Sequence, residues 1–430
     1  MNHKHLPFII MAMMAAASIA AGCGSDDPDE VTPVTPVDST DTISEDTIPE
    51  DTIPEDTDTV EIPVDSTIYV KWTASGATVE VADELADQFT YEVSAGNVVL
   101  TNANVSDEFL FVLSGSSDDG SFTYNGEYKA SFQLNGLQLT STTGAAVDIQ
   151  CGKRIKLYLT EGTTNTFADA ATGTHKAAFN CQGHLEVSGA GTLNIEGNCN
   201  HALRSKEYLQ LKSSTGTINI TKAVADGIHC GEYLLMSGGT VSISGTGSDG
   251  LQVETDATST EELNGQLIMQ GGSINITMSA EDAKAIRLDA DATDATITPH
   301  MQLLDGTVTV SLSSTANGSK GLASDGNLTI GSASTKPTVD ITVAGATFTD
   351  SAGEENRATG IKADLTLTIA GGATTVKATG QKSRGVRATT LTATGGTLTV
   401  TNTGSKSQGI KLDNTFQSGQ GGTVSGSFKY

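Results

Sequence analysis

Short runs in which apolar and polar residues alternate recur along most of the chain. A glycine, or once a proline, opens each run: Gly191-Thr-Leu-Asn-Ile, Gly216-Thr-Ile-Asn-Ile, Gly239-Thr-Val-Ser-Ile, Gly272-Ser-Ile-Asn-Ile, Gly306-Thr-Val-Thr-Val, Pro337-Thr-Val-Asp-Ile, Gly372-Ala-Thr-Thr-Val and Gly396-Thr-Leu-Thr-Val. Alternation with a period of two predicts short β-strands that bury one face. The runs start 23 to 35 residues apart, which indicates an internal repeat.

A second marker, a small residue followed by an apolar one, advances in step with the first. Its positions are Ala146-Val, Ala178-Phe, Ala202-Leu, Gly227-Ile, Gly250-Leu, Ala285-Ile, Gly321-Leu, Gly360-Ile, Gly385-Val and Gly409-Ile. Each repeat therefore holds at least two strands and two turns. The consensus of leucine-rich repeats and the aromatic signatures of propeller blades are absent. The repeat favours an all-β parallel β-helix of about ten rungs over 133–430, with loops at 254–265, 289–300 and 350–356.

Residues 69–132 differ from the repeats because they hold ten of the twenty aromatic residues. An uncapped β-helix would expose its core and its strand edges. We therefore expect 69–132 to form a β-rich N-terminal cap and the first strands, with the aromatic side chains in its core.

The N-terminus is typical of a secreted lipoprotein. Residues 1–22 combine a weakly basic start, an apolar run and small residues before Cys23, which predicts a signal peptide and lipidation of Cys23. The alternative is ordinary cleavage beside a chance cysteine. The acidic run behind Cys23 resembles the surface-export signal of outer-membrane lipoproteins, so we expect a lipid-anchored protein on the cell surface.

Net charge separates the tether from the folded part. The formal charge is −27, and residues 24–65 contain fifteen acidic residues and no lysine or arginine. Such a segment cannot bury enough apolar surface to fold, which predicts a disordered tether over 23–68, although an acidic binding segment is the alternative. The folded part is then near −13, and this acidity argues against nucleic acid as a partner.

Several motifs between residues 130 and 255 resemble a known family. These are Leu134-Asn-Gly-Leu-Gln-Leu-Thr-Ser, Ala145-Ala-Val-Asp-Ile, Leu157-Tyr-Leu-Thr-Glu-Gly-Thr-Thr-Asn-Thr, Gly189-Ala-Gly-Thr-Leu-Asn-Ile, Ala225-Asp-Gly-Ile-His and Ser248-Asp-Gly-Leu. They are similar to the clostridial cellulose- and polygalacturonate-binding β-helix family. The resemblance implies a right-handed parallel β-helix, bound calcium and polysaccharide binding without established catalysis. The Asp-Gly motifs at Asp226 and Asp249 match best, whereas later repeats carry Lys284, Lys320, Thr359, Arg384 and Gln408 in place of that aspartate.

Equal positions in successive rungs stack into columns. Two places after the small residue of the second marker, the side chain points outward. This "basic column" contains Arg204, His229, Arg287, Lys362, Arg387 and Lys411, with Ala323 in one rung. Two places further on, an "acidic column" contains Glu254, Asp289, Asp325 and Asp364. The columns either form a ladder of surface ion pairs or line a groove for an anionic polysaccharide, in which the bases hold uronate carboxylates.

Calcium ligands are predicted among the acidic residues, since calcium takes several oxygen ligands. The candidates are Asp226, Asp249, Glu254, Asp289, Asp291, Asp325 and Asp364. Asp294, in the same loop as Asp291, is a further candidate.

A third column aligns Arg154, His184, Tyr208 and Tyr233 on consecutive rungs. Three outward rings with polar tips suit contacts with sugars. A stacked ladder beneath a loop is the alternative. Cys151, Cys181 and Cys230 fall in an inward column, where buried thiols with at most one disulfide, Cys151–Cys181, are expected.

The chain has no complete catalytic signature. The Asn-Thr-Asp and Gly-His-Gly motifs of polygalacturonases are absent, and no Ser-His-Asp order or His-Cys cluster is seen. Three hypotheses follow: a surface-tethered, calcium-assisted binder of an acidic or plant-cell-wall polysaccharide, a divergent polysaccharide lyase, or an adhesin or structural rod that recognises protein. The first is the prediction, and it makes the protein a non-enzyme.

Overall fold

The computed structural model describes residues 66–290, 296–419 and 421–430. The predicted signal peptide, Cys23, nearly all of the tether, Asp291 and Asp294 lie outside these residues. Within them, no helix has the length and apolar character needed to cross a membrane. The described part is all-β, with one large, mostly parallel sheet and a single short 3-10 helix, η3 (Asp83–Gln88).

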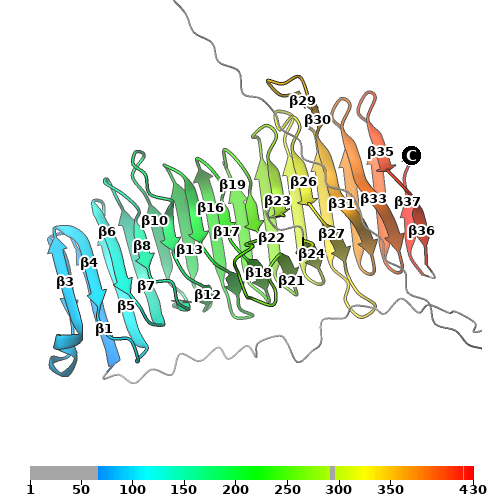
Figure 1. Cartoon of the computed structure of the whole chain (residues 1–430). Helices are drawn as coiled ribbons and strands as arrows, with labels where there is room; N and C mark the ends of the chain where they lie inside the picture. The colour runs from blue at the N-terminus through cyan, green and yellow to red at the C-terminus, as the bar shows by residue number, and fades with distance from the viewer. Residues whose placement is uncertain (1–65, 291–295, 420) are drawn as a thin grey trace, which may run out of the picture. The chain divides into compact units, whose positions relative to one another are not determined.

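Alternating sequences form strands whose pairing repeats every three strands. Each of the three ladders collects one strand from every repeat, and we name them A, B and C in the order in which the chain visits them. Figure 1 shows the strands of residues 66–430 side by side, in sequence order from blue to red.

Ladder A contains β4 (Gly96–Asn102), β6 (Gly120–Gly126), β8 (Val147–Gln150), β11 (Ala177–Cys181), β14 (His201–Ser205), β17 (Ile228–Cys230), β20 (Leu251–Glu254), β23 (Lys284–Asp289), β26 (Lys320–Ser324), the first parts of β31 (Thr359–Ile369) and β33 (Arg384–Ala393), β35 (Gln408–Leu412) and β38 (Phe428–Lys429).

Ladder B contains β1 (Thr67–Thr73), β5 (Phe109–Ser117), β7 (Ala130–Thr140), β9 (Ile155–Leu159), β12 (Leu185–Ser188), β15 (Leu209–Leu211), β18 (Tyr233–Met236), β21 (Gln266–Met269), β24 (His300–Leu303), β27 (Asn327–Ile330), the second parts of β31 and β33, and β36 (Phe416–Ser418).

Ladder C contains the end of β7, β10 (Thr164–Ala168), β13 (Thr192–Gly197), β16 (Thr217–Ala223), β19 (Thr240–Ser244), β22 (Ser273–Met278), β25 (Thr307–Leu312), β28 (Thr338–Val343), β32 (Ala373–Ala378), β34 (Thr397–Asn402) and β37 (Thr423–Ser425).

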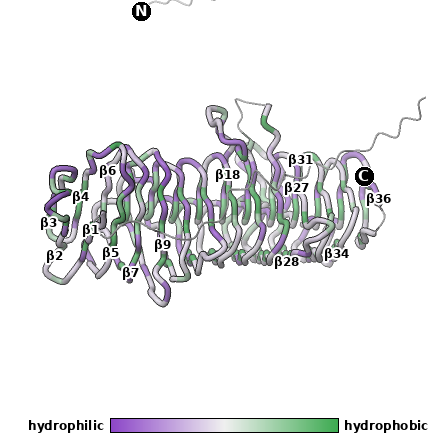
Figure 2. Tube along the Cα trace, turned by 90° about the horizontal axis from the view of Figure 1, so that it is seen from below, coloured by the Kyte–Doolittle hydropathy of each residue, from purple (hydrophilic) through white to green (hydrophobic). Residues whose placement is uncertain are grey.

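The core lies between the ladders and is built by the apolar member of each marker. The apolar residue of the second marker is buried in all ten repeats: Val147, Phe179, Leu203, Ile228, Leu251, Ile286, Leu322, Ile361, Val386 and Ile410. Hydrophobic and hydrophilic positions alternate along the strands (Figure 2). The prediction that this position points inward is confirmed.

The glycine of the first marker is required by geometry as well as by the turn. Gly272 has a φ of +83°, a conformation that L side chains rarely adopt. A Cβ built there would lie 2.5 Å from the carbonyl oxygen of Gly239 in the preceding repeat. The repeated glycine thus lets successive turns of the chain approach closely.

The N-terminal part differs from the repeats in its pairing. β1 pairs antiparallel with β2 (Gly76–Glu80), and β3 (Phe89–Ser94) pairs antiparallel with β4. Parallel pairing already joins β1 to β5 and β4 to β6, N-terminal to residue 133. Seven of the ten aromatic side chains are buried there, as predicted: Trp72, Phe89, Phe109, Phe111, Phe122, Tyr124 and Phe132. The prediction is wrong for Tyr69 and Tyr91, which are exposed, and Tyr128 is only partly buried.

The insertions and the cysteines are largely as expected. The loop expected at 254–265 is wrong in its first residue, because Glu254 ends β20, and residues 255–265 contain no strand. The loop expected at 289–300 is wrong at both ends, because Asp289 belongs to β23 and His300 to β24. The loop expected at 350–356 is wrong in its last two residues, because β29 (Thr347–Thr349) and β30 (Glu355–Arg357) form a two-stranded antiparallel hairpin. The four cysteines among the described residues are free thiols: Cys151, Cys181 and Cys230 are buried and Cys199 is partly exposed.

Candidate functional site

The basic column predicted from the sequence exists as a row of register partners on ladder A. His229 is the partner of Arg204, Lys362 the partner of Ala323, and Arg387 lies between Lys362 and Lys411. Parallel neighbours in register stack their side chains about 4.8 Å apart. The column is therefore a line of stacked side chains, interrupted in charge at Gln252, between His229 and Arg287, and at Ala323.

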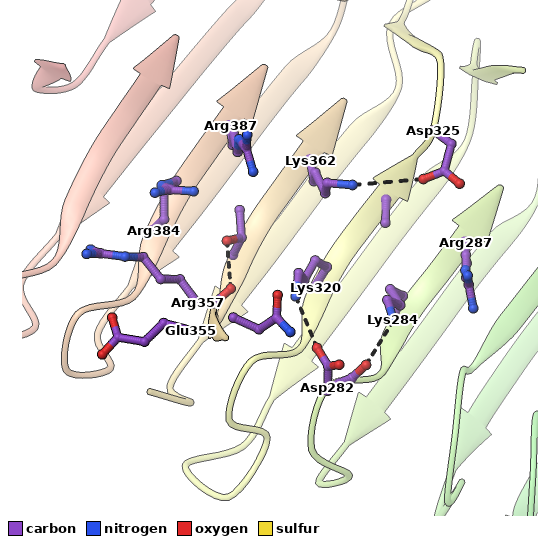
Figure 3. A pocket seen from close by; sticks show the side chains of 13 residues that line it. Asp282, Lys284, Arg287, Lys320, Asp325, Glu355, Arg357, Lys362, Arg384 and Arg387 are labelled. Atoms are coloured by element: carbon purple, nitrogen blue, oxygen red, sulfur yellow. Dashed lines mark hydrogen bonds and ion pairs between the residues drawn. The ribbon is translucent and has the colours of Figure 1, made fainter. Parts of the chain in front are cut away.

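A hollow of about 430 Å³ opens around the interruption at Ala323 (Figure 3). Strands β23, β26, β31 and β33 and the hairpin strand β30 contribute its walls. Seven lining side chains are basic and three are acidic: Lys284, Arg287, Lys320, Arg357, Lys362, Arg384 and Arg387, against Asp282, Asp325 and Glu355. A net positive hollow on an acidic protein is a feature that attracts anions.

Four of the basic residues in the hollow were missed as candidates. Lys284, Lys320 and Arg384 occupy the places where the early repeats carry the aspartate of Asp-Gly. They were recognised as replacements of a predicted calcium ligand, but not as candidates for binding an anion. Lys284 is in register with Lys320, and Arg384 follows two strands after Lys320, with Thr359 between them. The column that holds aspartate in the early repeats thus holds mostly basic residues in the later ones. This change could have been recognised from the sequence. Arg357 comes from the hairpin, which no repeat pattern predicts.

Acidic partners neutralise one end of the hollow. Lys320 Nζ lies 3.4 Å from Asp282 Oδ1, and Lys284 Nζ donates a 2.9 Å hydrogen bond to the carbonyl oxygen of Asp282. Lys362 Nζ lies 2.9 Å from Asp364 and 3.9 Å from Asp325. These lysines carry charges that are already partly compensated within the protein.

The opposite end holds three arginines, of which Arg387 lies 3.5 Å from Asp413 Oδ2 and the other two, Arg357 and Arg384, have little compensation. Arg384 Nε donates to the amide oxygen of Gln408 at 3.1 Å, and Arg357 Nη1 donates to a backbone carbonyl. Neither has a carboxylate within 4.0 Å among the described residues. Burial, with the neighbouring Arg357 and Arg387 charges, lowers the pKa of Arg384 to about 10. At neutral pH these guanidinium groups remain cations that repel one another, so an external anion would stabilise them.

The remaining predicted basic residues lie outside the hollow or at its rim. Arg287 lies between Asp249 at 3.2 Å and Asp289 at 2.5 Å. Lys411 Nζ lies 3.1 Å from Asp413, and Arg204 donates to Asn180 at 3.2 Å. For Arg287 and Lys411 the alternative of a ladder of surface ion pairs describes the geometry, whereas the partner of Arg204 is a neutral amide.

The predicted stack of rings is present, but its exposure is not as expected. The rings of His184 and Tyr208 stack with centroids 4.1 Å apart, and those of Tyr208 and Tyr233 with centroids 4.6 Å apart. Tyr208 and Tyr233 are buried, so their faces are not offered to a sugar. The alternative of a stacked ladder inside the protein is the better description, and Glu261 of the 255–265 loop lies 3.9 Å from His184.

Carboxylates surround the histidine end of this stack. His184 Nε2 lies 2.8 Å from Glu207 Oε2 and 3.7 Å from Glu232 Oε2. Burial, reinforced by the neighbouring Glu232 for Glu207, raises the pKa of both glutamates. The Glu232 side chain is 8% exposed, and its Oε2 accepts no hydrogen bond from the described residues. Glu207 and Glu232 can be recognised from the sequence as the acids of their repeats, shifted by one place from the acidic column, but their position around His184 was not predicted.

The carboxylates of Asp226 and Asp249 do not fit a calcium site. Asp226 Oδ2 lies 3.2 Å from His201 Nδ1 and 3.0 Å from His229 Nδ1, and Asp226 Oδ1 accepts the backbone N–H of Asp249. Asp249 in turn accepts the backbone N–H of Lys284 and a guanidinium hydrogen bond from Arg287. Calcium requires a set of free oxygen ligands, whereas nitrogen groups surround these two carboxylates.

Charge and burial explain the protonation of this group. Burial opposes ionisation of Asp226, but hydrogen bonds from His201 and His229 hold its pKa well below the usual value. Burial likewise opposes protonation of His229, yet its hydrogen bonds to Asp226 and Glu254 raise its pKa to about 9. His201 was not among the predicted site residues.

The acidic column is also largely engaged. Glu254 and Asp289 are register partners, and the side-chain amide of Gln252 donates to both, at 3.0 and 2.9 Å. Burial, countered by Arg287 and reinforced by Asp325, raises the pKa of Asp289 to about 6. Calcium along Glu254, Asp289, Asp325 and Asp364 stays a prediction.

Comparisons with known proteins found one family and one solved structure that resemble this chain. A family model described as "Carbohydrate-binding domain-containing protein" matches residues 95–409. A solved structure titled "Structure of the polysaccharide lyase-like protein from C. thermocellum, Gadolinium derivative" is similar at 21% identity and a TM-score of 0.49, over 63% of this chain and 98% of that chain. No curated protein matches the sequence.

Proposed function

The chain belongs to the family of carbohydrate-binding domain-containing proteins, and we propose that it binds an acidic polysaccharide in the hollow around Ala323. The observation that carries the proposal is the arginine group formed by Arg357 and Arg384, which have no carboxylate within 4.0 Å among the described residues, and by Arg387, whose one carboxylate partner is Asp413 at 3.5 Å. A planar guanidinium group matches a carboxylate or sulfate in two parallel hydrogen bonds. A neutral glycan offers no group that would offset the mutual repulsion of these three charges.

The ladder suits a polymer rather than a single sugar. Arg387 and Lys362 are register partners on adjacent strands, and Arg384 lies on the same strand as Arg387. Cations therefore recur along the stacking direction at about 4.8 Å per strand. A chain with one negative charge per sugar could engage several of them at once, which multiplies weak contacts into useful affinity.

We further propose that the three ladders form a right-handed parallel β-helix anchored to the outer membrane. The support is the three-strand pairing repeat and the sequence of the N-terminus. Lipidation at Cys23 and the acidic tether over 23–68 would hold the binding domain at the cell surface. Mass analysis of the protein from a membrane fraction, before and after lipoprotein lipase, tests the anchor.

Affinity electrophoresis in gels with polygalacturonate tests the binding proposal. The full-length protein should be retarded, and retarded less when both Arg384 and Arg387 are changed to glutamine. Because a hydrogen bond to a charged group contributes about 1.5–3 kcal/mol, each loss should weaken binding by about tenfold or more. Lys377→Ala, a charge loss on an exposed part of ladder C, is the matched control.

Three outcomes distinguish the alternatives. Equal retardation in a neutral cellulose-derivative gel and persistence in the double variant would refute the acidic-glycan proposal. Retardation that disappears with a calcium chelator and returns with added calcium would support calcium assistance through the acidic column. Unsaturated uronide products during incubation would establish a lyase, although a cationic Arg384 suits carboxylate binding better than proton removal.

A further inference from the structure

We propose that His201, Asp226 and His229 form a binding site for a divalent transition metal, with zinc as the best-fitting ion. These residues lie on or between two successive strands of ladder A, β14 and β17. One ligand atom from each lies within 4.8 Å of the others. The site is independent of the anion-binding hollow, because none of its residues lines that hollow.

The spacing of the ligand atoms agrees with a tetrahedral ion. Zinc binds histidine nitrogen and carboxylate oxygen at about 2.0–2.2 Å, so neighbouring ligands in a tetrahedron lie about 3.3 Å apart. Asp226 Oδ2 lies 3.2 Å from His201 Nδ1 and 3.0 Å from His229 Nδ1. The two imidazole rings stack with centroids 4.4 Å apart, and the Nδ1 atoms of both lie beside the same carboxylate oxygen, Asp226 Oδ2.

Neighbouring groups hold the ligands in place. The backbone N–H of Asp249 donates to Asp226 Oδ1 at 2.9 Å and leaves Oδ2 facing the histidines. His229 Nε2 lies 3.5 Å from Glu254 Oε2, so its far ring nitrogen faces a carboxylate while Nδ1 faces Asp226. A carboxylate behind a ligating histidine fixes the ring orientation and strengthens the ligand.

The chemistry of the donor set selects the class of metal. Two imidazoles and one carboxylate suit zinc and similar ions, whereas calcium and magnesium prefer oxygen alone. Asp226 is 3% exposed, so the ion would lie beside a buried charge. The nearby cation of Arg204, the register neighbour of His229, already has a hydrogen-bond partner, because it donates to Asn180 in the preceding repeat. Binding would release the proton that His229 shares with Asp226. Three protein ligands leave a fourth position for water.

Isothermal titration of chelator-treated full-length protein with zinc chloride tests the proposal. One zinc per chain should bind, and His201→Ala and His229→Ala should each weaken this event by at least tenfold. Cobalt(II) should give the visible absorption of a tetrahedral site, and this spectrum should be lost in Asp226→Asn. His300→Ala, which removes a histidine from ladder B, is the matched control and should leave the titration unchanged.

The opposite results would overturn the proposal. Absence of saturable zinc binding in the wild-type protein would do so, as would an unchanged titration in the His201→Ala, His229→Ala double variant. Calcium binding that Asp226→Asn abolishes and the double variant preserves would assign the carboxylate to calcium instead. Circular dichroism of each variant separates loss of ligands from loss of fold.

Discussion

Replacing Ala323 with glutamate should weaken anion binding by about 10- to 100-fold without weakening the fold. Ala323 lines the hollow and has Arg287 and Lys362 as its register partners on the two sides. A glutamate there would face both cations, and opposite charges on neighbouring strands contribute about 0.2–1 kcal/mol per pair. The free energy of unfolding should therefore stay the same or rise slightly.

The effect on binding follows from Coulomb repulsion. A carboxylate about 5 Å from the carboxylate of a bound uronate repels it by about 3 kcal/mol at an effective dielectric constant of 20. Solvent in the open hollow reduces this value, and salt screens it further. Binding at low ionic strength should thus weaken by about 10- to 100-fold, since each 1.4 kcal/mol corresponds to a factor of ten.

Titration of the variant with polygalacturonate oligomers provides the measurement, and Ala323→Gln is the control for side-chain volume. The glutamine variant should retain most of the affinity, and added salt should narrow its difference from the glutamate variant. If both variants lose affinity equally, the effect is steric. If neither loses affinity, the ligand does not occupy the hollow, and the proposed function at this position is refuted.

Three further predictions concern stability and reactivity. Gly272→Ala should lower the free energy of unfolding in urea by at least about 1 kcal/mol because its φ is positive, whereas Gly152→Ala, with no neighbouring atom within 4 Å, should change it little. Glu232→Gln should raise the stability of the protein at pH 7 but not at pH 4. A buried carboxyl group with a raised pKa favours the folded state only when it is protonated, and this stabilisation is lost as the pH rises above about 4.5. Thermal melts across a pH series measure the effect, and the control variant Glu161→Gln, at an exposed position, should show no such difference. In the native protein a thiol reagent should label Cys199 faster than the three buried thiols, Cys151, Cys181 and Cys230, and equal rates counted by mass spectrometry would contradict the burial.

The repeat is what made the fold predictable. Once a glycine-led strand recurs, the position of one inward residue fixes the others, so the column through Arg204, Lys362 and Arg387 could be derived before any coordinates. Burial of the apolar residue at each marker follows from the same period of two. Where the chain repeats itself, residues at equal places in successive repeats become neighbours in a ladder, so their spatial order can be derived from the sequence.

The site was less predictable because it depends on what the repeat does not encode. Arg357 reaches the hollow from a hairpin that has no counterpart in other repeats, and spacing gives no information about where such an insertion folds back. The burial of Tyr208 and Tyr233 could not be derived from alternation. Alternation distinguishes side chains that point into the core from side chains that point outward, but it does not show whether other residues cover an outward side chain. His201 was missed because it precedes the small residue of its marker, a place that holds no other histidine.

The hairpin of β29 and β30 lines the proposed ligand site but belongs to none of the three ladders. Its two strands pair only with each other among the described residues, while it contributes Glu355 and Arg357 to the hollow. Exchange of these few residues could therefore change which ligand is preferred while every ladder keeps its register. Related proteins could therefore diverge in ligand preference through changes in this one short insertion. The same hairpin is a position at which new ligand specificity could be engineered.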